Sequence, residues 1–470
     1  MGQSNFTKKE AIFDLVSLFE EMSQTEVVQF PTDESYYKLI DYFQEECQLN
    51  RALEVIEYAI TQHPFSAGFH FRKAQLLLDS QQEELAMAAL DEAEIHSPGN
   101  REISLLRSEI LASLELFDDA LAILEGLKLE TDEGKELSNI YLYESLVYES
   151  MKSHERRYYA LKAALMENPN NQAALKKMWF CTEISKKFKE SIALHEKILE
   201  DNPFSALAWR NLGAAQAYFC DYEAAVVSYE YAFLIDENFE FAYMDCAEMC
   251  FEMSNYRNAL QCYQDVLERF EPDYYIFQRI GQCYQNLGNF VIAKTFFEKA
   301  IQLEHFNDEA FFYLAQCYAK EESWKKAICF YVKAIRINDK QEEYFSGLAA
   351  AYYQLGEYDK AGPFFKEAAE IAPELSQYWI QYASFLMEID MKEQALEILD
   401  EAEEYAVGTE LLYCRVACLF SLGHRKEALY LLGDALDEDF SMHESLFSLL
   451  PVLEEDTDIQ AIIATYQPYC

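Results

Sequence analysis

Alanine recurs along this chain with a period of 34 residues, and Ser191 and Arg157 take its place in two of the repeats. The column runs through Ala225, Ala259, Ala293, Ala327, Ala361 and Ala395, continues to Ala428 after 33 residues, and extends back through Ser191, Arg157, Ala120, Ala86 and Ala52. A period this long, kept over most of a chain, is typical of an array of repeated supersecondary units.

Other columns keep the same phase and predict what each unit contains. Aromatic residues stand sixteen positions before the alanine column, small residues twelve before it, aromatic residues four after it and a second alanine seven after it. Offsets of three, four and seven place residues on one face of a helix. Small side chains let two antiparallel helices approach, and rings fill the remaining space. Each unit is therefore predicted to be a helix-turn-helix.

Residues that end helices occupy the predicted turns. Gly288, Gly356 and Gly423 fall between the two helices of their units, where a residue with positive φ often ends the first helix. Proline recurs twelve positions after the alanine column, where it closes the second helix because it cannot continue the hydrogen-bond ladder. Twelve units are predicted over residues 33–442, starting at 33, 67, 101, 138, 172, 206, 240, 274, 308, 342, 376 and 409.

These columns resemble the tetratricopeptide repeat (TPR) family. Units 274–307 and 308–341 match its spacing almost fully, with Phe277, Ile280, Gly281, Tyr284, Ala293, Phe297 and Ala300, then Phe311, Leu314, Ala315, Tyr318, Ala327, Tyr331 and Ala334. The resemblance implies an all-α fold, a right-handed superhelix (α-solenoid) of about twelve repeats whose concave face is lined by first helices. The chain also resembles stand-alone bacterial TPR proteins without an attached domain, and this likeness implies a bacterial source.

Further predictions concern the two ends of the chain and one interruption of the 34-residue period. Residues 1–32 hold a helical stripe of Ile12, Leu15, Val16, Phe19 and Met22, and are expected to cap the first unit. Residues 443–470 are expected to cap the last unit, with a helix starting near Thr457. Three extra residues precede Arg157, so the stretch 126–137 is predicted to be either a hinge or a longer surface loop.

Composition narrows the classes of function. The chain has 38 Lys and Arg against 83 Asp and Glu, a net charge of −45, yet 51% of its residues are hydrophobic. That apolar content excludes a disordered acidic chain. The charge argues against nucleic acid and anionic membrane surfaces as partners. No run of 18 apolar residues and no secretory apolar segment occurs, so no membrane span and a cytoplasmic location are expected.

A search for chemistry finds no candidate site. Glycine-rich phosphate loops and nucleophile motifs are absent, and the nearest metalloprotease match begins at His195 but has Leu199 where the second histidine belongs. His195 is expected to be packed or half-exposed. The pairs Cys246/Cys250 and Cys414/Cys418 lack further ligands at metal spacing, so the cysteines are expected to be buried, reduced thiols. No catalytic residue, cofactor or metal is predicted, and the chain is not expected to be an enzyme.

The resemblance directs attention to the concave groove as the place where a protein or peptide partner binds. Family members that hold the C-terminal carboxylate of chaperones use Lys and Asn on one first helix, Asn on the next and Lys and Arg on a third. Lys176 and Asn211 approach this set, but Phe180, Phe241 and Asp245 replace its other members. No such clamp is therefore expected.

One segment departs from the overall charge. Residues 152–189 carry nine cations against three carboxylates, a net +6 inside a chain of −45. Lys176, Lys177 and Phe180 are expected to face the groove, with Arg210 and Asn211 on the next first helix. This set is predicted to bind a carboxylate or an acidic segment. The alternative is that the cations only offset repulsion among neighbouring carboxylates.

A second groove segment is uncharged. Its residues on successive first helices are Gln278, Gln282, Gln285, Phe312, Gln316 and Tyr353. Amides can bond a peptide backbone and rings can cover its side chains, so this segment is predicted to suit an extended peptide. The alternative is ordinary solvated helix surface.

Three functions remain open at this point. The leading one is a non-catalytic scaffold or adaptor that binds a peptide or protein segment in its groove, since a curved array displays a long concave surface. The second is a peptide-responsive regulator whose superhelix pitch changes on binding. The third is a self-associating structural subunit, a homodimer joined through the C-terminal cap at Leu446 and Phe447.

Overall fold

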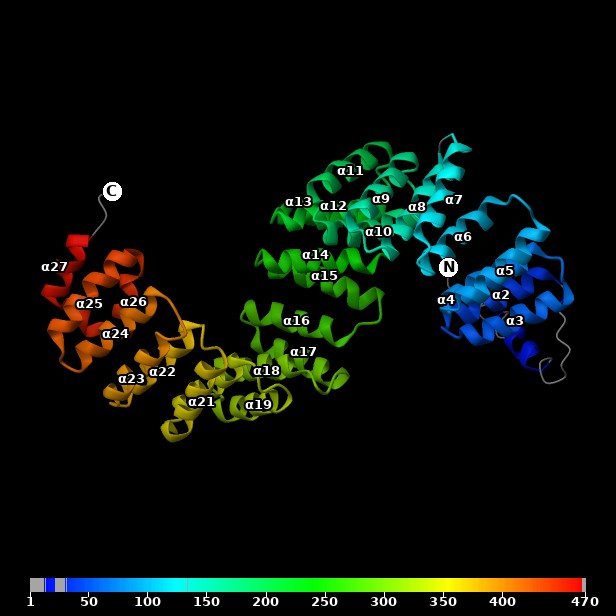
Figure 1. The fold of residues 1–470 in the computed structure, drawn as a ribbon. Helices are drawn as coiled ribbons and strands as arrows, with labels where there is room; N and C mark the ends of the chain where they lie inside the picture. The colour runs from blue at the N-terminus through cyan, green and yellow to red at the C-terminus, as the bar shows by residue number, and fades with distance from the viewer. Residues whose placement is uncertain (1–11, 13, 22–29, 31, 133, 467–470) are drawn as a thin grey trace. The chain divides into compact units, whose positions relative to one another are not determined.

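The structure, a computed structural model, describes residues 12, 14–21, 30, 32–132 and 134–466. These residues form helices and no strands, so the predicted all-α class is confirmed. Successive helices are joined by short turns and pack side by side as pairs along the chain (Figure 1).

The first helices of the pairs are mostly 13 residues long, about three and a half turns. They are α2 (Asp33–Glu45), α4 (Ala67–Asp79), α6 (Arg101–Ser113), α8 (Lys135–Ser150), α10 (Gln172–Ser185), α12 (Ala206–Tyr218), α14 (Glu240–Glu252), α16 (Tyr274–Asn286), α18 (Asp308–Lys320), α20 (Glu342–Gln354), α22 (Ser376–Glu388) and α24 (Thr409–Ser421). Several start at a side chain that accepts a hydrogen bond from an N–H of the first turn, as Asn171, Ser205 and Asn307 do.

The second helices follow after turns of about three residues. They are α3 (Leu49–Gln62), α5 (Glu83–His96), α7 (Phe117–Leu129), α9 (His154–Glu167), α11 (Phe188–Asp201), α13 (Tyr222–Ile235), α15 (Tyr256–Arg269), α17 (Phe290–Leu303), α19 (Trp324–Ile337), α21 (Tyr358–Ile371), α23 (Lys392–Ala402) and α25 (Arg425–Glu438). The C-terminal segment adds η1 (Phe440–His443), α26 (Glu444–Leu449), η2 (Pro451–Glu455) and α27 (Thr457–Tyr466).

A left-handed residue ends each of these twelve first helices. Gly288, Gly356 and Gly423 have φ of 77°, 74° and 83°, as their position in the sequence predicts. The same place is taken elsewhere by residues with a side chain, at φ between 56° and 64°: Cys47, Gln81, Glu115, Lys152, Lys186, Cys220, Ser254, Glu322 and Asp390. Nine non-glycine residues thus adopt a conformation that costs roughly 1–2 kcal/mol each, because the turn geometry requires it.

Close approach of paired helices rests on the column of small residues. A Cβ added at Gly281 on α16 would lie 2.6 Å from the ring of Phe297 on α17, and one at Gly213 on α12 would lie 2.9 Å from the ring of Tyr229 on α13. Both rings are buried. The predicted packing of small residues against aromatic rings is confirmed in these pairs.

The chain divides into two compact units, residues 1–245 and 246–470, and the division falls within α14. In the first unit, one cluster joins α2, α3 and α4 and includes Tyr36 and Phe43 of α2, Val55 of α3 and Phe69 of α4, each at most 1% exposed. In the second, a cluster around Trp379 and Phe365 spans α20 to α24. Each core is a row of such clusters, every one shared between a helix pair and the next.

The extra residues before Arg157 lie in a helix. The first helix α8 has 16 residues and begins at Lys135, so the insertion lengthens its N-terminal turn instead of forming the expected longer loop. Residue 133 lies outside the described residues. Arg157, at the place of the packed alanine, is 4% exposed, and its guanidinium lies 2.8 Å from a carboxylate oxygen of Glu149. The division between the two compact units falls in α14, several helix pairs farther along the chain, and not at 126–137.

The terminal segments pack on their neighbours. Residues 14–21 are helical, and the buried ring of Phe19 contacts Phe43 and Tyr58; Met22, also expected on this stripe, lies outside the described residues. Helix α27 begins at Thr457, as predicted. Leu446 is fully buried in a cluster with Tyr413 and Leu432, so it cannot offer an exposed surface to a second copy. Leu446 therefore cannot contribute to the homodimer contact that the sequence predicted.

Candidate functional site

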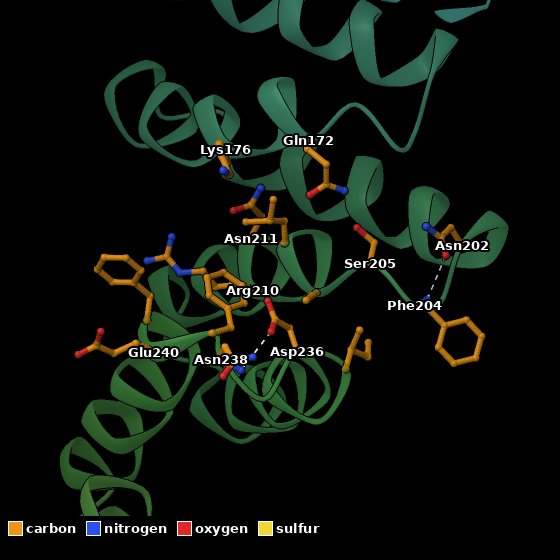
Figure 2. A pocket seen from close by; sticks show the side chains of 15 residues that line it. Gln172, Lys176, Asn202, Phe204, Ser205, Arg210, Asn211, Asp236, Asn238 and Glu240 are labelled. Carbon is orange, nitrogen blue, oxygen red and sulfur yellow. Dashed lines mark hydrogen bonds between the residues drawn. The ribbon is translucent and has the colours of Figure 1, made fainter. Parts of the chain in front are cut away.

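A cavity of about 780 Å³ opens in the first unit along three successive first helices, α10, α12 and α14. Two turns close its side, the one between α11 and α12 and the one between α13 and α14 (Figure 2). Its lining residues are Gln172, Lys176, Asn202, Phe204, Ser205, Ala206, Leu207, Arg210, Asn211, Ile235, Asp236, Asn238, Phe239, Glu240 and Phe241. First helices line the concave face in the predicted fold, which makes this cavity the candidate site.

Two cations reach the cavity from different helices. Lys176 on α10 is exposed and has no carboxylate partner within 4.0 Å among the described residues. Arg210 on α12 donates from Nε to Asp245 Oδ2 at 2.7 Å, and its guanidinium carbon lies 5.7 Å from the centre of the Phe241 ring. Lys176 is therefore the cation whose charge is available to a ligand, while Arg210 is held between a carboxylate and a ring.

Asn211 lines the same cavity but is not free to donate into it. Its side chain is 2% exposed, and Nδ2 donates to the Leu175 carbonyl at 2.9 Å and to His195 Nε2 at 3.3 Å. The expected exposed groove position is thus wrong for Asn211, because α11 and α10 cover its amide. Figure 2 shows Asn211 between Lys176 and Arg210 in this view.

His195 explains the burial of that amide. It is fully buried, and its Nδ1 lies 2.7 Å from the Ser191 carbonyl, to which it donates, so Nε2 is the acceptor for Asn211. Burial lowers the pKa of His195 to about 4, so the ring is neutral at physiological pH. The expected packed histidine is confirmed.

The other two residues of the predicted cationic-aromatic set lie outside the cavity. Lys177 Nζ is 3.9 Å from Glu149, which also binds Arg157, and the Phe180 ring, 54% exposed, lies 5.9 Å from the Arg157 guanidinium. Lys187 likewise pairs with Glu155 at 2.9 Å. Part of the basic segment 152–189 is therefore used in local ion pairs, as the alternative interpretation expected.

Sequence reasoning missed the turn residues of the cavity. Phe204 is 77% exposed although it is aromatic, and Asn202 and Asp236 each accept a hydrogen bond from a backbone N–H two residues on, which fixes the two turns. The signal was present in the sequence. Phenylalanine follows the end of a second helix again at Phe65 and Phe306, and both are exposed by more than three quarters.

The predicted uncharged segment lies in the second unit, and most of its amides are already bonded. Gln278 is 4% exposed, accepts from Asn307 Nδ2 at 2.9 Å and donates to Glu309 Oε2 at 2.6 Å. Gln282 is buried and accepts from Arg279, and Gln285 donates to Gln316 at 2.8 Å. The expectation of free groove amides is wrong for Gln278, which is bonded to Asn307 and Glu309, and for Gln282, which is buried and bonded to Arg279 of its own helix.

The remaining members of that segment line two other cavities. Phe312, 5% exposed, and Gln316 line one of about 290 Å³, and Tyr353 lines another of about 370 Å³. Phe312 packs on Tyr331 and Tyr344, so it forms a wall and is not an exposed ring.

Groups suited to metal binding or membrane insertion were sought throughout the described residues. Within them, no three His, Cys, Asp or Glu side chains are grouped so as to hold a metal ion. No described helix combines the length and apolar character needed to cross a bilayer. Seven of the described cysteines are buried, as expected, while Cys47, Cys220 and Cys329 are exposed.

Family profiles match two parts of the chain. One, described as "Tetratricopeptide repeat", matches residues 37–100, and one, described as "Anaphase-promoting complex, cyclosome, subunit 3", matches residues 286–368. This chain carries tetratricopeptide repeats. No curated protein matches the TPR chain in sequence.

Several solved structures are similar to the TPR chain. "YrrB: a TPR protein with an unusual peptide-binding site" is 19% identical, covering 39% of this chain and 95% of its own, with a TM-score of 0.34. The MamA protein is 18% identical, covering 37% and 94%, with a TM-score of 0.34. The APC/C hetero-tetramer Cut9–Hcn1 gives 13% identity, covering 95% and 98%, with a TM-score of 0.38.

Proposed function

We propose that this chain is a non-catalytic scaffold, and that its twelve predicted repeats bind an extended segment of a partner protein in the α10–α12–α14 cavity. The observation that carries the proposal is the convergence of Lys176, Arg210 and Phe241 from three first helices on one cavity of about 780 Å³. Pockets of this size with a few polar groups on mostly rigid elements are typical binding sites. The repeats are protein-interaction units, and we place the protein in the cytoplasm.

The cavity is lined by two cations, Lys176 and Arg210, and by two carboxylates, Asp236 and Glu240, so it is the part formed by α10 and α12 that favours a carboxylate of a partner segment. Lys176 offers an unpaired ammonium, and Arg210 keeps its terminal nitrogens for a ligand because only Nε is bonded to Asp245. Phe204 and Phe241 are 77% and 66% exposed; the Phe241 ring lies beside Arg210, and Phe204 lines the cavity from the turn before α12. Exposed rings beside a cavity favour protein binding, since aromatic side chains dominate the energetics of interfaces.

A charge reversal confined to the cavity tests the proposal. The tagged full-length chain would be used to recover partners from its native cells, beside the variant Lys176→Glu and the double variant Lys176→Glu/Arg210→Glu. We expect the single reversal to reduce recovery of the main partner about tenfold and the double reversal to abolish it, because a carboxylate would then face like charge. Lys176 is exposed and unpaired, so its replacement should leave the thermal melting curve unchanged.

A matched control comes from the same basic segment. Lys186 and Lys189 are exposed and lie outside the cavity, so Lys186→Glu/Lys189→Glu makes the same change in net charge as the double variant. Recovery of the partner should be unaffected by this control. Equal loss with both double variants would show that only net charge matters, and full recovery with Lys176→Glu/Arg210→Glu would place the partner elsewhere; either result contradicts the proposed site.

A further inference from the structure

Three small residues hollow the groove face of α20 in the second unit. Ser346, Gly347 and Ala350 occupy successive positions of that face, between α18 and α22. Two cavities, of about 370 and 290 Å³, adjoin there and share Ser346, Gly347 and Gln381. A larger residue at Gly347 is excluded on one side, because a Cβ there would lie 2.7 Å from the ring of Tyr331. We call the two cavities together the α20 hollow.

The halves of the α20 hollow differ in chemistry. The larger cavity has a floor of Phe365, Ile380 and Phe385, with Ala350 and Tyr353 at its side, and it suits one apolar side chain. The smaller cavity is lined by the amides of Gln316, Gln377 and Gln381. Gln316 and Gln381 already accept hydrogen bonds from Gln285 and Ser346, so these two amides chiefly offer their N–H donors to the C=O groups of an extended peptide.

The charged side chains that line the α20 hollow are all carboxylates. Glu343 lines the smaller cavity and Glu388 the larger, where it accepts a hydrogen bond from the Tyr353 hydroxyl. Burial and the nearby charges of Glu342 and Glu309 raise the pKa of Glu343. Glu342 and Glu309 therefore add to the negative potential at Glu343, and a cation placed beside Glu343 would relieve this repulsion.

We propose that the α20 hollow binds an extended segment of a partner protein in which an apolar side chain stands beside Lys or Arg. The apolar side chain fills the cavity between α20 and α22, and the peptide backbone bonds the amides. Basic side chains on either side of it reach Glu343 at one end of the hollow and Glu388 at the other. This is a second site, with the opposite charge preference to the α10–α12–α14 cavity, and it does not depend on the function proposed there.

Synthetic peptides test the chemistry directly. The probes are three acetylated and amidated seven-residue peptides with central triplets Lys-Leu-Lys, Lys-Ser-Lys and Glu-Leu-Glu, titrated into the full-length chain in 150 mM NaCl by calorimetry. We expect the Lys-Leu-Lys peptide to bind at least tenfold more tightly than either of the others. Equal binding of Lys-Leu-Lys and Lys-Ser-Lys would mean attraction to an acidic surface only, and no binding of Lys-Leu-Lys up to millimolar concentration would also overturn the proposal.

Two variants assign the binding to this place. Ala350→Leu fills the apolar cavity from an exposed position, and Glu343→Gln/Glu388→Gln removes two charges while keeping hydrogen-bond acceptors. Each should weaken Lys-Leu-Lys binding about tenfold. The control Glu393→Gln/Glu397→Gln removes the same charge from exposed positions of the second helix α23 and should change binding less than twofold.

The outcomes separate this site from the first. Lys176→Glu should bind the Lys-Leu-Lys peptide as the unaltered chain does, so a failure of the α10–α12–α14 site leaves this experiment intact. Tight binding that is insensitive to Ala350→Leu and to Glu343→Gln/Glu388→Gln would place the peptide elsewhere and overturn the proposal. Circular dichroism melting curves check that each variant is folded.

Discussion

At the residue scale, one buried histidine makes a separable contribution to the pH response of the first unit. His195 has a pKa of about 4 in the folded chain because it is fully buried, against about 6.5 in an unfolded chain. Between these values the unfolded chain binds a proton that the folded chain does not. The free energy of unfolding therefore falls as pH drops below about 6.5, and the loss stops growing near pH 4.

We expect His195→Gln to remove this acid sensitivity. Glutamine keeps a donor and an acceptor for the Ser191 carbonyl and Asn211 but does not titrate in this range. Between pH 7 and pH 5 the unaltered chain should lose about 2 kcal/mol more unfolding free energy than His195→Gln. Denaturant unfolding at the two pH values measures this loss of free energy for each chain. Comparing the two chains cancels the contribution of the carboxylates, because both chains contain them.

An exposed histidine provides the comparison for His195. His154→Gln makes the same substitution at an exposed position of the same unit and is the matched control. If His195→Gln also follows the unaltered chain, then the ring is not held neutral by burial.

Position within the period predicted the burial of apolar columns better than it predicted the exposure of groove columns. His195 falls in an apolar column and is buried, as expected, whereas Asn211 falls in a groove column and is also buried. The difference arises because His195 reaches Asn211 from the neighbouring helix, 3.3 Å away. A period places a residue on a face of its own helix, but which side chain covers that face depends on the residue opposite, and Gln278 is covered by Asn307 and Glu309 for the same reason.

At the scale of the element, the turn between paired helices requires a left-handed residue whatever its identity. Gly288 and Glu322 end consecutive first helices, α16 and α18, with φ of 77° and 56°. Glycine adopts this conformation without strain, while any residue with a Cβ is strained there. Nothing lies within 4 Å of a Cβ built at Gly288, so packing does not enter the comparison.

We therefore expect alanine to have different effects at the two turns. Gly288→Ala should lower the unfolding free energy of the second unit by about 1 kcal/mol, since it introduces a Cβ into the left-handed region. Glu322→Ala should leave it within about 0.5 kcal/mol, because the strain is already present and Glu322 is exposed. Thermal or denaturant unfolding of the two variants measures this difference. Equal losses of unfolding free energy would show that strain in the left-handed backbone is not the cause of the loss.

Helix ends were predictable from the sequence where a glycine marks them, and less predictable elsewhere. The glycines at 288, 356 and 423 marked their turns correctly. The three extra residues before Arg157 were expected in a hinge or loop, but Lys135, Glu136 and Leu137 form an added turn of α8. Glycine at 134 supplies the break, with φ of 84°, and Leu137 gains burial from the longer helix. At this place the packing of Leu137 favours a longer helix than the repeat length predicts.

At the scale of the whole molecule, the period predicted the all-α array but not its division within α14. That division reflects how contacts are distributed, and no Pro, Gly or charge run in residues 240–252 marks it. The 34-residue period likewise did not predict the cavities. Cavity volume depends on departures from the repeated pattern, such as the Gly347 and Ala350 pair on α20 and the exposed ring of Phe204 in a turn.

The net charge of −45 predicts how the folded chain responds to salt. Two effects oppose each other. Exposed ion pairs such as Lys366–Glu370, 3.2 Å apart, contribute at most about 1 kcal/mol each and weaken as salt is added. Repulsion among the excess carboxylates destabilises the compact state, and it is screened as the Debye length falls from about 30 Å at 0.01 M to about 3 Å at 1 M. Since most carboxylates have no cation to pair with, relief of repulsion wins.

We expect the melting temperature to rise when NaCl is increased from 20 mM to 500 mM, by about 4 °C if each unit gains 1–2 kcal/mol. NaCl is chosen because sulfate would also strengthen apolar burial. Replacing Glu393, Glu397, Glu401 and Glu404 on and after α23 by Gln should raise the melting temperature at 20 mM and flatten its dependence on salt, because these exposed carboxylates are part of the repulsion. A melting temperature that falls with NaCl would mean that the ion pairs, and not the excess charge, dominate the stability of the array.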